Sequence, residues 1–146
     1  MFLLLSLACA PLESNDVRET GEAPDTAEAA DITWDTSGDP PGWSDVFPLL
    51  EARCGGCHQS DYIGRFVVPG DATATYTRLL GEEAVQDEGR FYVVPGDLTA
   101  SLLIEKIGDD PQFGDAMPPE GQRDVTPLST HEIGMIRTWV EAGALE

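Results

Sequence analysis

Cys54-Gly55-Gly56-Cys57-His58 stands before the middle of the 146-residue chain and brings two thiols and an imidazole together. Two residues separate the cysteines, so on a helical turn both sulfur atoms face the same side. His58 follows at once and can turn towards whatever the thiols hold. The chain has one other cysteine, Cys9, and three cysteines are too few for a disulfide framework. The pattern therefore indicates a site for a bound group.

This spacing is the attachment signature of c-type haem. Two thiols at this separation can add across the two vinyl groups on one edge of the porphyrin. The next residue then places an imidazole beneath the iron. The sequence thus predicts one covalent haem c on Cys54 and Cys57, with His58 as an axial ligand.

Three other interpretations compete with haem. A structural zinc site needs four ligands, usually from two cysteine pairs, and the sequence has no second pair. A thioredoxin-like dithiol follows a strand in a βαβ unit, and no such pattern surrounds Cys54. A chance match stays open, because the pattern fixes only three positions. Haem attachment takes place outside the cytoplasm, so signs of export favour haem.

A second iron ligand would come from farther along the chain, where Met117, Met135 and His131 are the candidates. Met117 lies in an irregular segment followed by Pro118 and Pro119, which stiffen the backbone. Met135 and His131 fall within a helical run, in which Met usually fills the core. We therefore predict Met117 as the sixth ligand, with His131, Met135 or an open position as alternatives.

Several further motifs follow the haem signature in a fixed order: Val94-Pro95-Gly96-Asp97, Ser101-Leu102-Leu103, Met117-Pro118-Pro119, Glu132-Ile133 and Trp139-Val140-Glu141-Ala142-Gly143-Ala144. Over residues 46–145 this order resembles the small planctomycete-type cytochrome c domains found on bacterial lipoproteins. The resemblance implies an all-α fold, a small class I-like cytochrome c domain with helices around a covalent haem. It also implies that Cys54 and Cys57 hold the haem, and that His58 and Met117 are its axial ligands.

Helical periodicity predicts four helices. The first runs from about Asp45 to Cys57, with Pro48 in its first turn, where a missing N–H costs least. The last covers 129–142 and begins with the capping pair Ser129 and Glu132. Its largest side chain, Trp139, is expected to pack against the first helix.

Two central segments, 64–81 and 89–108, repeat each other. Each reads as an extended piece, a Pro-Gly turn, an Asp N-cap (Asp71 or Asp97) and a helix closed by glycine. Two copies are fewer than a solenoid needs, so we expect helices that wall in the haem rather than a duplicated binding unit. Arg65 and Arg90 hold equivalent places and are candidates to pair with haem propionates, although surface arginines are commoner.

Residues 1–9 read as the apolar core of a secretory signal, although no Lys or Arg precedes it. The run is shorter than the roughly 20 apolar residues of a membrane-spanning helix. Cys9 follows Ser6-Leu7-Ala8, an imperfect lipobox, so we expect a lipid anchor there; a cysteine within a cleaved signal is the alternative. The protein is therefore predicted to be exported, either periplasmic or membrane-anchored, in a Gram-negative-type bacterium.

Residues 10–42 are rich in Glu, Asp, Thr, Ala, Gly and Pro and lack apolar periodicity, which predicts a disordered acidic linker before a domain over 43–146. Trp34 and Trp43 are expected to be incidental or docking residues at the edge of this linker. The whole chain carries 27 acidic and 8 basic residues, a net charge of −19. Binding of nucleic acid or of an anionic membrane by charge is therefore excluded. The expected partners are redox proteins with basic docking patches, and the expected membrane contact is through Cys9.

With His and Met in both axial positions, haem iron has no open place for peroxide or oxygen. The sequence therefore predicts an electron-transfer protein that cycles between Fe(II) and Fe(III), and not an enzyme. A peroxidase or gas-binding protein is the alternative if Met117 can be displaced. A haem module that docks a larger complex is the third possibility.

Overall fold

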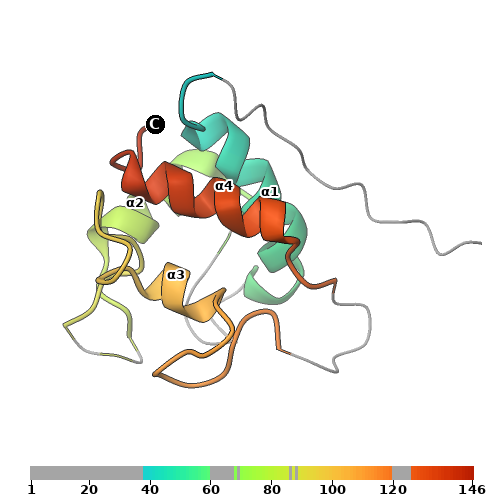
Figure 1. Cartoon of the computed structure of the whole chain (residues 1–146), viewed down its shortest axis with the longest axis vertical. Helices are drawn as coiled ribbons and strands as arrows, with labels where there is room; N and C mark the ends of the chain where they lie inside the picture. Colours follow the sequence, from blue (N-terminus) through green and yellow to red (C-terminus); the bar gives the residue numbers. More distant parts are fainter. Residues whose placement is uncertain (1–37, 60–67, 69, 86, 88, 120–125) are drawn as a thin grey trace, which may run out of the picture.

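The computed structural model describes residues 38–59, 68, 70–85, 87, 89–119 and 126–146. Four helices occur in these residues, with no strand among them: α1 (Trp43–His58), α2 (Ala72–Gly81), α3 (Leu102–Lys106) and α4 (Thr130–Glu141) (Figure 1). The prediction of an all-α fold is confirmed for this part of the chain. None of the described helices combines the length and apolar character that crossing a membrane requires.

Some predictions lie outside the described residues. These are the signal over 1–9 with its anchor at Cys9, the greater part of the linker over 10–42, and Arg65. The first of the two repeated segments is described only from residue 68 onwards, with residue 69 omitted. Its helix and N-cap can therefore be compared with those of the second segment.

Helix α1 begins at Trp43, two residues earlier than predicted, and continues through His58. The Asp45 carboxylate accepts a hydrogen bond from the Gly42 backbone N–H (2.9 Å), which satisfies one donor at the helix start. Pro48 therefore lies inside the helix, and its placement in the first turn was wrong. The Ser44 carbonyl consequently has no N–H from Pro48, and both residues are exposed, so water can solvate that carbonyl.

The two repeated segments form different structures despite their similar sequences. Asp71 caps α2 as predicted, because its carboxylate accepts a hydrogen bond from the Ala74 N–H (2.7 Å). Asp97 instead closes a turn by accepting from the Ala100 N–H (3.0 Å), and α3 begins only after Ser101. The prediction that Asp97 is an N-cap was therefore wrong. The Ser101 hydroxyl donates to the Asp97 carbonyl (2.7 Å) and stabilises this turn. The equivalent residues of the first segment form the start of α2 instead.

An aromatic cluster joins α1, α2 and α4. The ring centroid of Trp43 lies 5.4 Å from that of Trp139, 5.4 Å from that of Tyr76 and 5.5 Å from that of Phe47. Trp139 is fully buried against α1, which confirms its predicted packing. Trp43 is only 5% exposed, so its assignment to the linker edge was wrong. Large aromatic surfaces contribute strongly to core stability, and Trp43 provides one.

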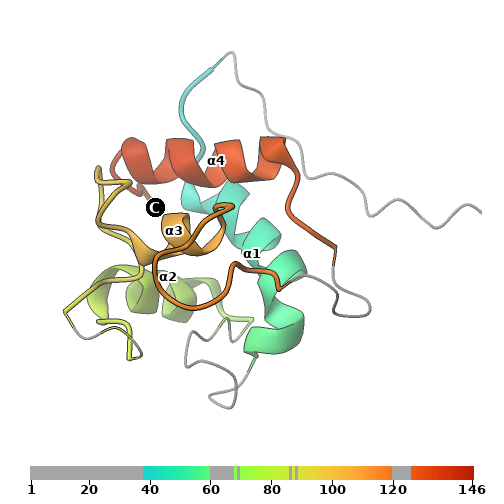
Figure 2. The same ribbon diagram turned by 60° about the horizontal axis from the view of Figure 1, so that its bottom comes forward.

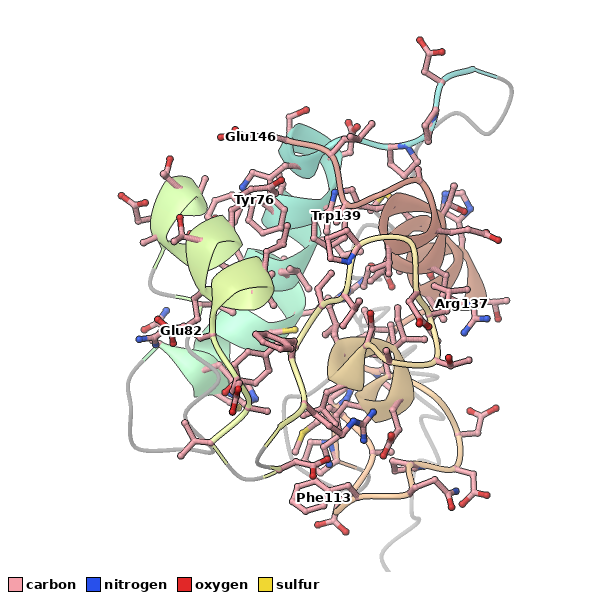
Figure 3. The ribbon with its side chains drawn as sticks, turned by 90° about the vertical axis from the view of Figure 1, so that its left-hand side faces the viewer. Tyr76, Glu82, Phe113, Arg137, Trp139 and Glu146 are labelled. Carbon is pink, nitrogen blue, oxygen red and sulfur yellow. The ribbon has the colours of Figure 1, made fainter. Side chains whose placement is uncertain are left out.

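The last residues of the chain are tied to the same cluster. The Leu145 carbonyl accepts hydrogen bonds from the Trp43 backbone N–H (3.1 Å) and from the Trp139 indole N–H (2.9 Å). The Tyr76 hydroxyl donates to the Ala144 carbonyl (2.9 Å). Figure 3 shows Tyr76, Trp139 and Glu146 at this one end of the molecule.

Helix α4 lies across α1, and the two helices are in contact. Beyond α3, the segment 107–119 turns back towards the C-terminal end of α1 (Figure 2). The end of α1 that carries the Cys-Gly-Gly-Cys-His sequence therefore faces α3 and the segment that contains Met117.

Candidate functional site

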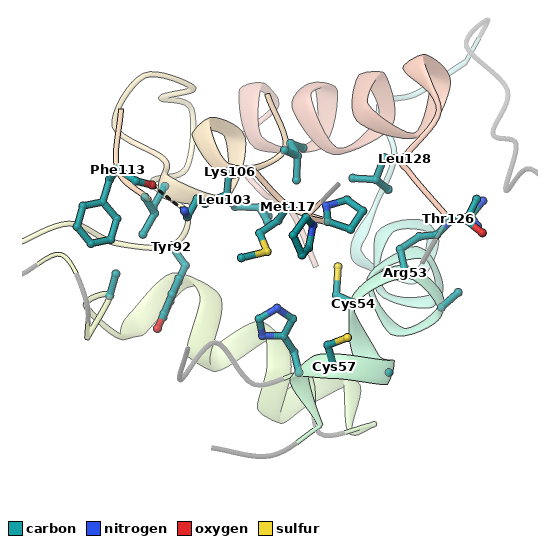
Figure 4. Close-up of a pocket in the computed structure, with 18 residues that line it drawn as sticks. Arg53, Cys54, Cys57, Tyr92, Leu103, Lys106, Phe113, Met117, Thr126 and Leu128 are labelled. Carbon is teal, nitrogen blue, oxygen red and sulfur yellow. Dashed lines mark hydrogen bonds between the residues drawn. The ribbon is translucent and has the colours of Figure 1, made fainter. Parts of the chain in front are cut away.

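A cavity of about 240 Å³ lies between the C-terminal end of α1, α3 and the segment that ends in Pro119 (Figure 4). Much of its wall is apolar and comes from Ala84, Tyr92, Leu102, Leu103, Ile107 and Leu128. Most of these side chains belong to the buried core, so the cavity is a hollow in the core itself. A planar apolar group placed there would contact apolar side chains of the core.

All four predicted site residues line this cavity: Cys54, Cys57 and His58 from the end of α1, and Met117 from the far segment. Figure 4 shows Met117 across the cavity from the two cysteines. The rival ligands lie elsewhere, because neither Met135 nor His131 is part of the cavity wall. Met135 is fully buried in the helical core.

The helix explains how the two thiols and the imidazole meet. Because α1 remains helical through His58, Cys54 and Cys57 lie one turn apart on one side. Cys54 is half-buried and Cys57 is exposed, so one edge of a bound group would lie near the surface. Burial, together with the neighbouring Cys57, raises the pKa of Cys54 from 9.0 to about 12.

Met117 is held by α3. Its backbone N–H donates to the Lys106 carbonyl (2.6 Å). The Lys106 ammonium donates to the carbonyls of Phe113 and Asp115, both at 2.6 Å. Lys106 itself lines the cavity, and sequence reasoning missed it. The one available signal was that it is the only lysine in the chain.

A buried ion pair lies beside Cys54. Arg53 lines the cavity, and its Nη2 and Nε atoms lie 2.7 and 2.8 Å from Oε1 of Glu132. The other carboxylate oxygen accepts from the Ser129 N–H (2.7 Å), and the Glu132 N–H donates to the Ser129 hydroxyl (3.2 Å). The predicted capping pair is therefore confirmed. The second role of Glu132, linking α4 to α1, was missed because 79 positions separate it from Arg53.

Arg90 has a different environment from the one expected for a propionate partner. Its Nη1 atom lies 2.6 Å from a Glu105 carboxylate oxygen and 3.1 Å from one of Asp87. Arg90 is not among the residues that line the cavity. Its geometry supports a structural role in holding Glu105.

The donor set fits haem c. Two thiols one helical turn apart suit the two porphyrin vinyl groups, and an imidazole and a thioether are available to iron. Among the described residues that line the cavity there is no carboxylate to attract a hard cation. No group of three or more His, Cys, Asp or Glu side chains able to hold a metal ion occurs within the described part of the chain. Comparison of the chain with protein-family models, curated proteins and solved structures gives no match.

Proposed function

We propose that this protein is a mono-haem c-type cytochrome that transfers electrons. Cys54 and Cys57 would hold the haem covalently, and His58 and Met117 would be its axial ligands. One observation carries the proposal: donors from two distant parts of the chain line a single apolar cavity. When bound, the haem supplies the one-electron couple between Fe(II) and Fe(III).

The residues of the chain would set the properties of that couple. The thioether of Met117 favours the reduced state, and so does burial among Leu102, Leu103 and Ile107. Both effects raise the reduction potential. The exposed position of Cys57 leaves one edge of the site near the surface, where electrons can pass without a substrate entering the cavity.

The described wall of the cavity lacks the groups of a peroxidase. General acid–base chemistry on peroxide needs a residue able to move a proton next to the iron. Among the described residues that line the cavity, His58 is the only histidine. Arg53 is paired with Glu132, and the ammonium of Lys106 is bound to two carbonyls. With Met117 in the sixth position, outer-sphere transfer is the chemistry that this arrangement supports.

The proposal includes a class I-like cytochrome c domain, and three features support it. The described chain is all-α, the signature lies at the end of α1, and the Met117 segment closes the other side of the cavity. Export belongs to the same proposal, because haem attachment takes place outside the cytoplasm. The net charge of −19 favours redox partners with basic docking patches.

Mass spectrometry tests the covalent site directly. The mature protein should carry the added mass of one haem after denaturation, and acidified organic solvent should not extract it. Cys54→Ala should leave at most one thioether bond and lower the yield of holoprotein. Cys9→Ser should leave the haem attached, because Cys9 lies outside the signature and is expected to be lipidated or removed with the signal. Haem that extracts freely from the wild type would refute the proposal.

A further inference from the structure

The only lysine of the chain lies at the C-terminal end of α3, against the segment that carries Met117. The ammonium nitrogen of Lys106 lies 2.6 Å from the Phe113 carbonyl oxygen and 2.6 Å from that of Asp115. It also lies 5.6 Å from the centroid of the Phe113 ring, within the range of a cation–π contact. This one ammonium group therefore contacts two carbonyls and one aromatic ring of the same short segment.

The segment 113–117 wraps closely around this ammonium. Gly114 has a φ of +59°, a conformation that side chains other than glycine rarely adopt. A Cβ atom at this position would lie 3.0 Å from the Lys106 nitrogen. The segment ends at Met117, whose N–H donates to the Lys106 carbonyl (2.6 Å). One residue therefore binds the segment through its side chain at the start and through its backbone at the end.

Glu105 braces the same segment from the neighbouring position. One of its carboxylate oxygens accepts a hydrogen bond from the Phe113 N–H (2.8 Å). The other receives the Arg90 guanidinium at 2.6 Å, which fixes the direction of the carboxylate. Hydrogen bonds with an ionised partner are stronger than neutral ones, and Lys106 and Glu105 supply three of them to a segment without helix or strand.

We propose that Lys106 is a positioning residue for Met117: its ammonium holds the segment 113–117 so that the thioether stays in the cavity and resists displacement from iron. This inference rests on the proposed function, because it takes Met117 as the sixth ligand. The ammonium acts through the backbone of the segment and does not itself contact the iron. Loss of the ammonium frees the carbonyls of Phe113 and Asp115 and allows Met117 to leave the cavity more often.

The test compares three variants of the holoprotein. Lys106→Leu removes the donors, Lys106→Arg keeps a charge that can reach the carbonyls, and Arg137→Leu makes the same charge change at an exposed position of α4. Two readouts follow Met117 on the ferric protein: the far-red methionine-to-iron charge-transfer band and the affinity for added imidazole, which must displace the thioether. A further readout is hydrogen exchange at the amides of Met117 and Phe113.

Lys106→Leu should weaken the band and raise the imidazole affinity by at least about tenfold, equivalent to about 1.4 kcal/mol. It should also speed exchange at the two amides. Lys106→Arg should recover most of both changes, and Arg137→Leu should match the wild type. Lys106→Gln, which is neutral but polar, should give a smaller change in the same direction and covers the case in which the leucine variant does not fold.

The outcomes separate the inference from the proposed function. Wild-type band intensity and imidazole affinity in Lys106→Leu, or in Lys106→Gln if only that variant folds, would overturn the inference alone. Equal effects of Arg137→Leu and Lys106→Leu would overturn it too, since charge and not position would then be responsible. A wild type with attached haem but no methionine band would overturn both, because Met117 would not be the ligand.

Discussion

Replacement of Arg53 by leucine should destabilise the fold more than any surface substitution. Glu132 is 0% exposed and the Arg53 side chain 10% exposed, so the variant leaves a carboxylate buried without its cationic partner. Breaking a buried pair from one side typically costs about 3–5 kcal/mol. Glu132 keeps its hydrogen bond from the Ser129 N–H, so we expect the lower end, about 3 kcal/mol. That is a large share of the roughly 5–15 kcal/mol that stabilises a typical domain.

Guanidinium denaturation of the purified holoprotein, followed by far-ultraviolet circular dichroism, measures this change. Arg78→Leu is the matched control, because Arg78 pairs with Glu82 on the surface of α2 and the two side chains are 29% and 53% exposed. That pair should contribute no more than about 1 kcal/mol. Adding Glu132→Gln to Arg53→Leu should recover part of the loss, since the amide is neutral and can still accept from Ser129. Equal destabilisation in Arg53→Leu and Arg78→Leu would refute the reasoning.

Two further predictions concern the ligand and the brace behind it. Met117→Ala should abolish the methionine charge-transfer band, lower the reduction potential and raise peroxidase activity by opening a coordination position. Met135→Leu should change none of these. Survival of the band in Met117→Ala would show that the wrong methionine was chosen. Burial alone would raise the pKa of Glu105, but the hydrogen bond from Arg90 and that from the Phe113 N–H bring it below its usual 4.5. The stabilisation from Arg90 should therefore be complete above about pH 4.5 and lost as the pH falls through the lowered pKa of Glu105. The measurement compares the free energy of unfolding of the wild type with that of Arg90→Leu. A difference that is the same at all pH values would contradict this prediction.

The parts of the fold that could be predicted from the sequence are those set by residues close together along the chain. The capping pair of α4 is three residues apart, and the attachment signature occupies five adjacent positions, so both can be read without tertiary knowledge. That Met117 lies in a segment without helix or strand was predicted from the prolines that follow it. Each of these inferences used neighbours along the chain.

The missed features depend on contacts between distant residues. Trp43 lies beside an acidic stretch in sequence. Its contacts with the distant rings of Tyr76 and Trp139, and the Ala72 carbonyl that accepts its indole N–H at 3.0 Å, make it a core residue. Asp71 and Asp97 have similar neighbours but different roles, since the turn at Asp97 is tied to α4 by the Gly96 N–H, which donates to the Val140 carbonyl at 2.7 Å. Arg53 gave no sign of its partner on α4.

The bond between Trp43 and Leu145 brings the two ends of the folded domain together. Residues 42 and 146 both lie at the start of α1. The cavity is lined by residues 52–54 and 56–58 towards the other end of this helix. Sixteen residues of helix separate these ends, a length of about 24 Å. A tag, dye or surface coupled through either end would therefore meet the domain at the pole opposite the cavity. The exposed Cys57 edge would then point away from the attachment and towards an approaching protein.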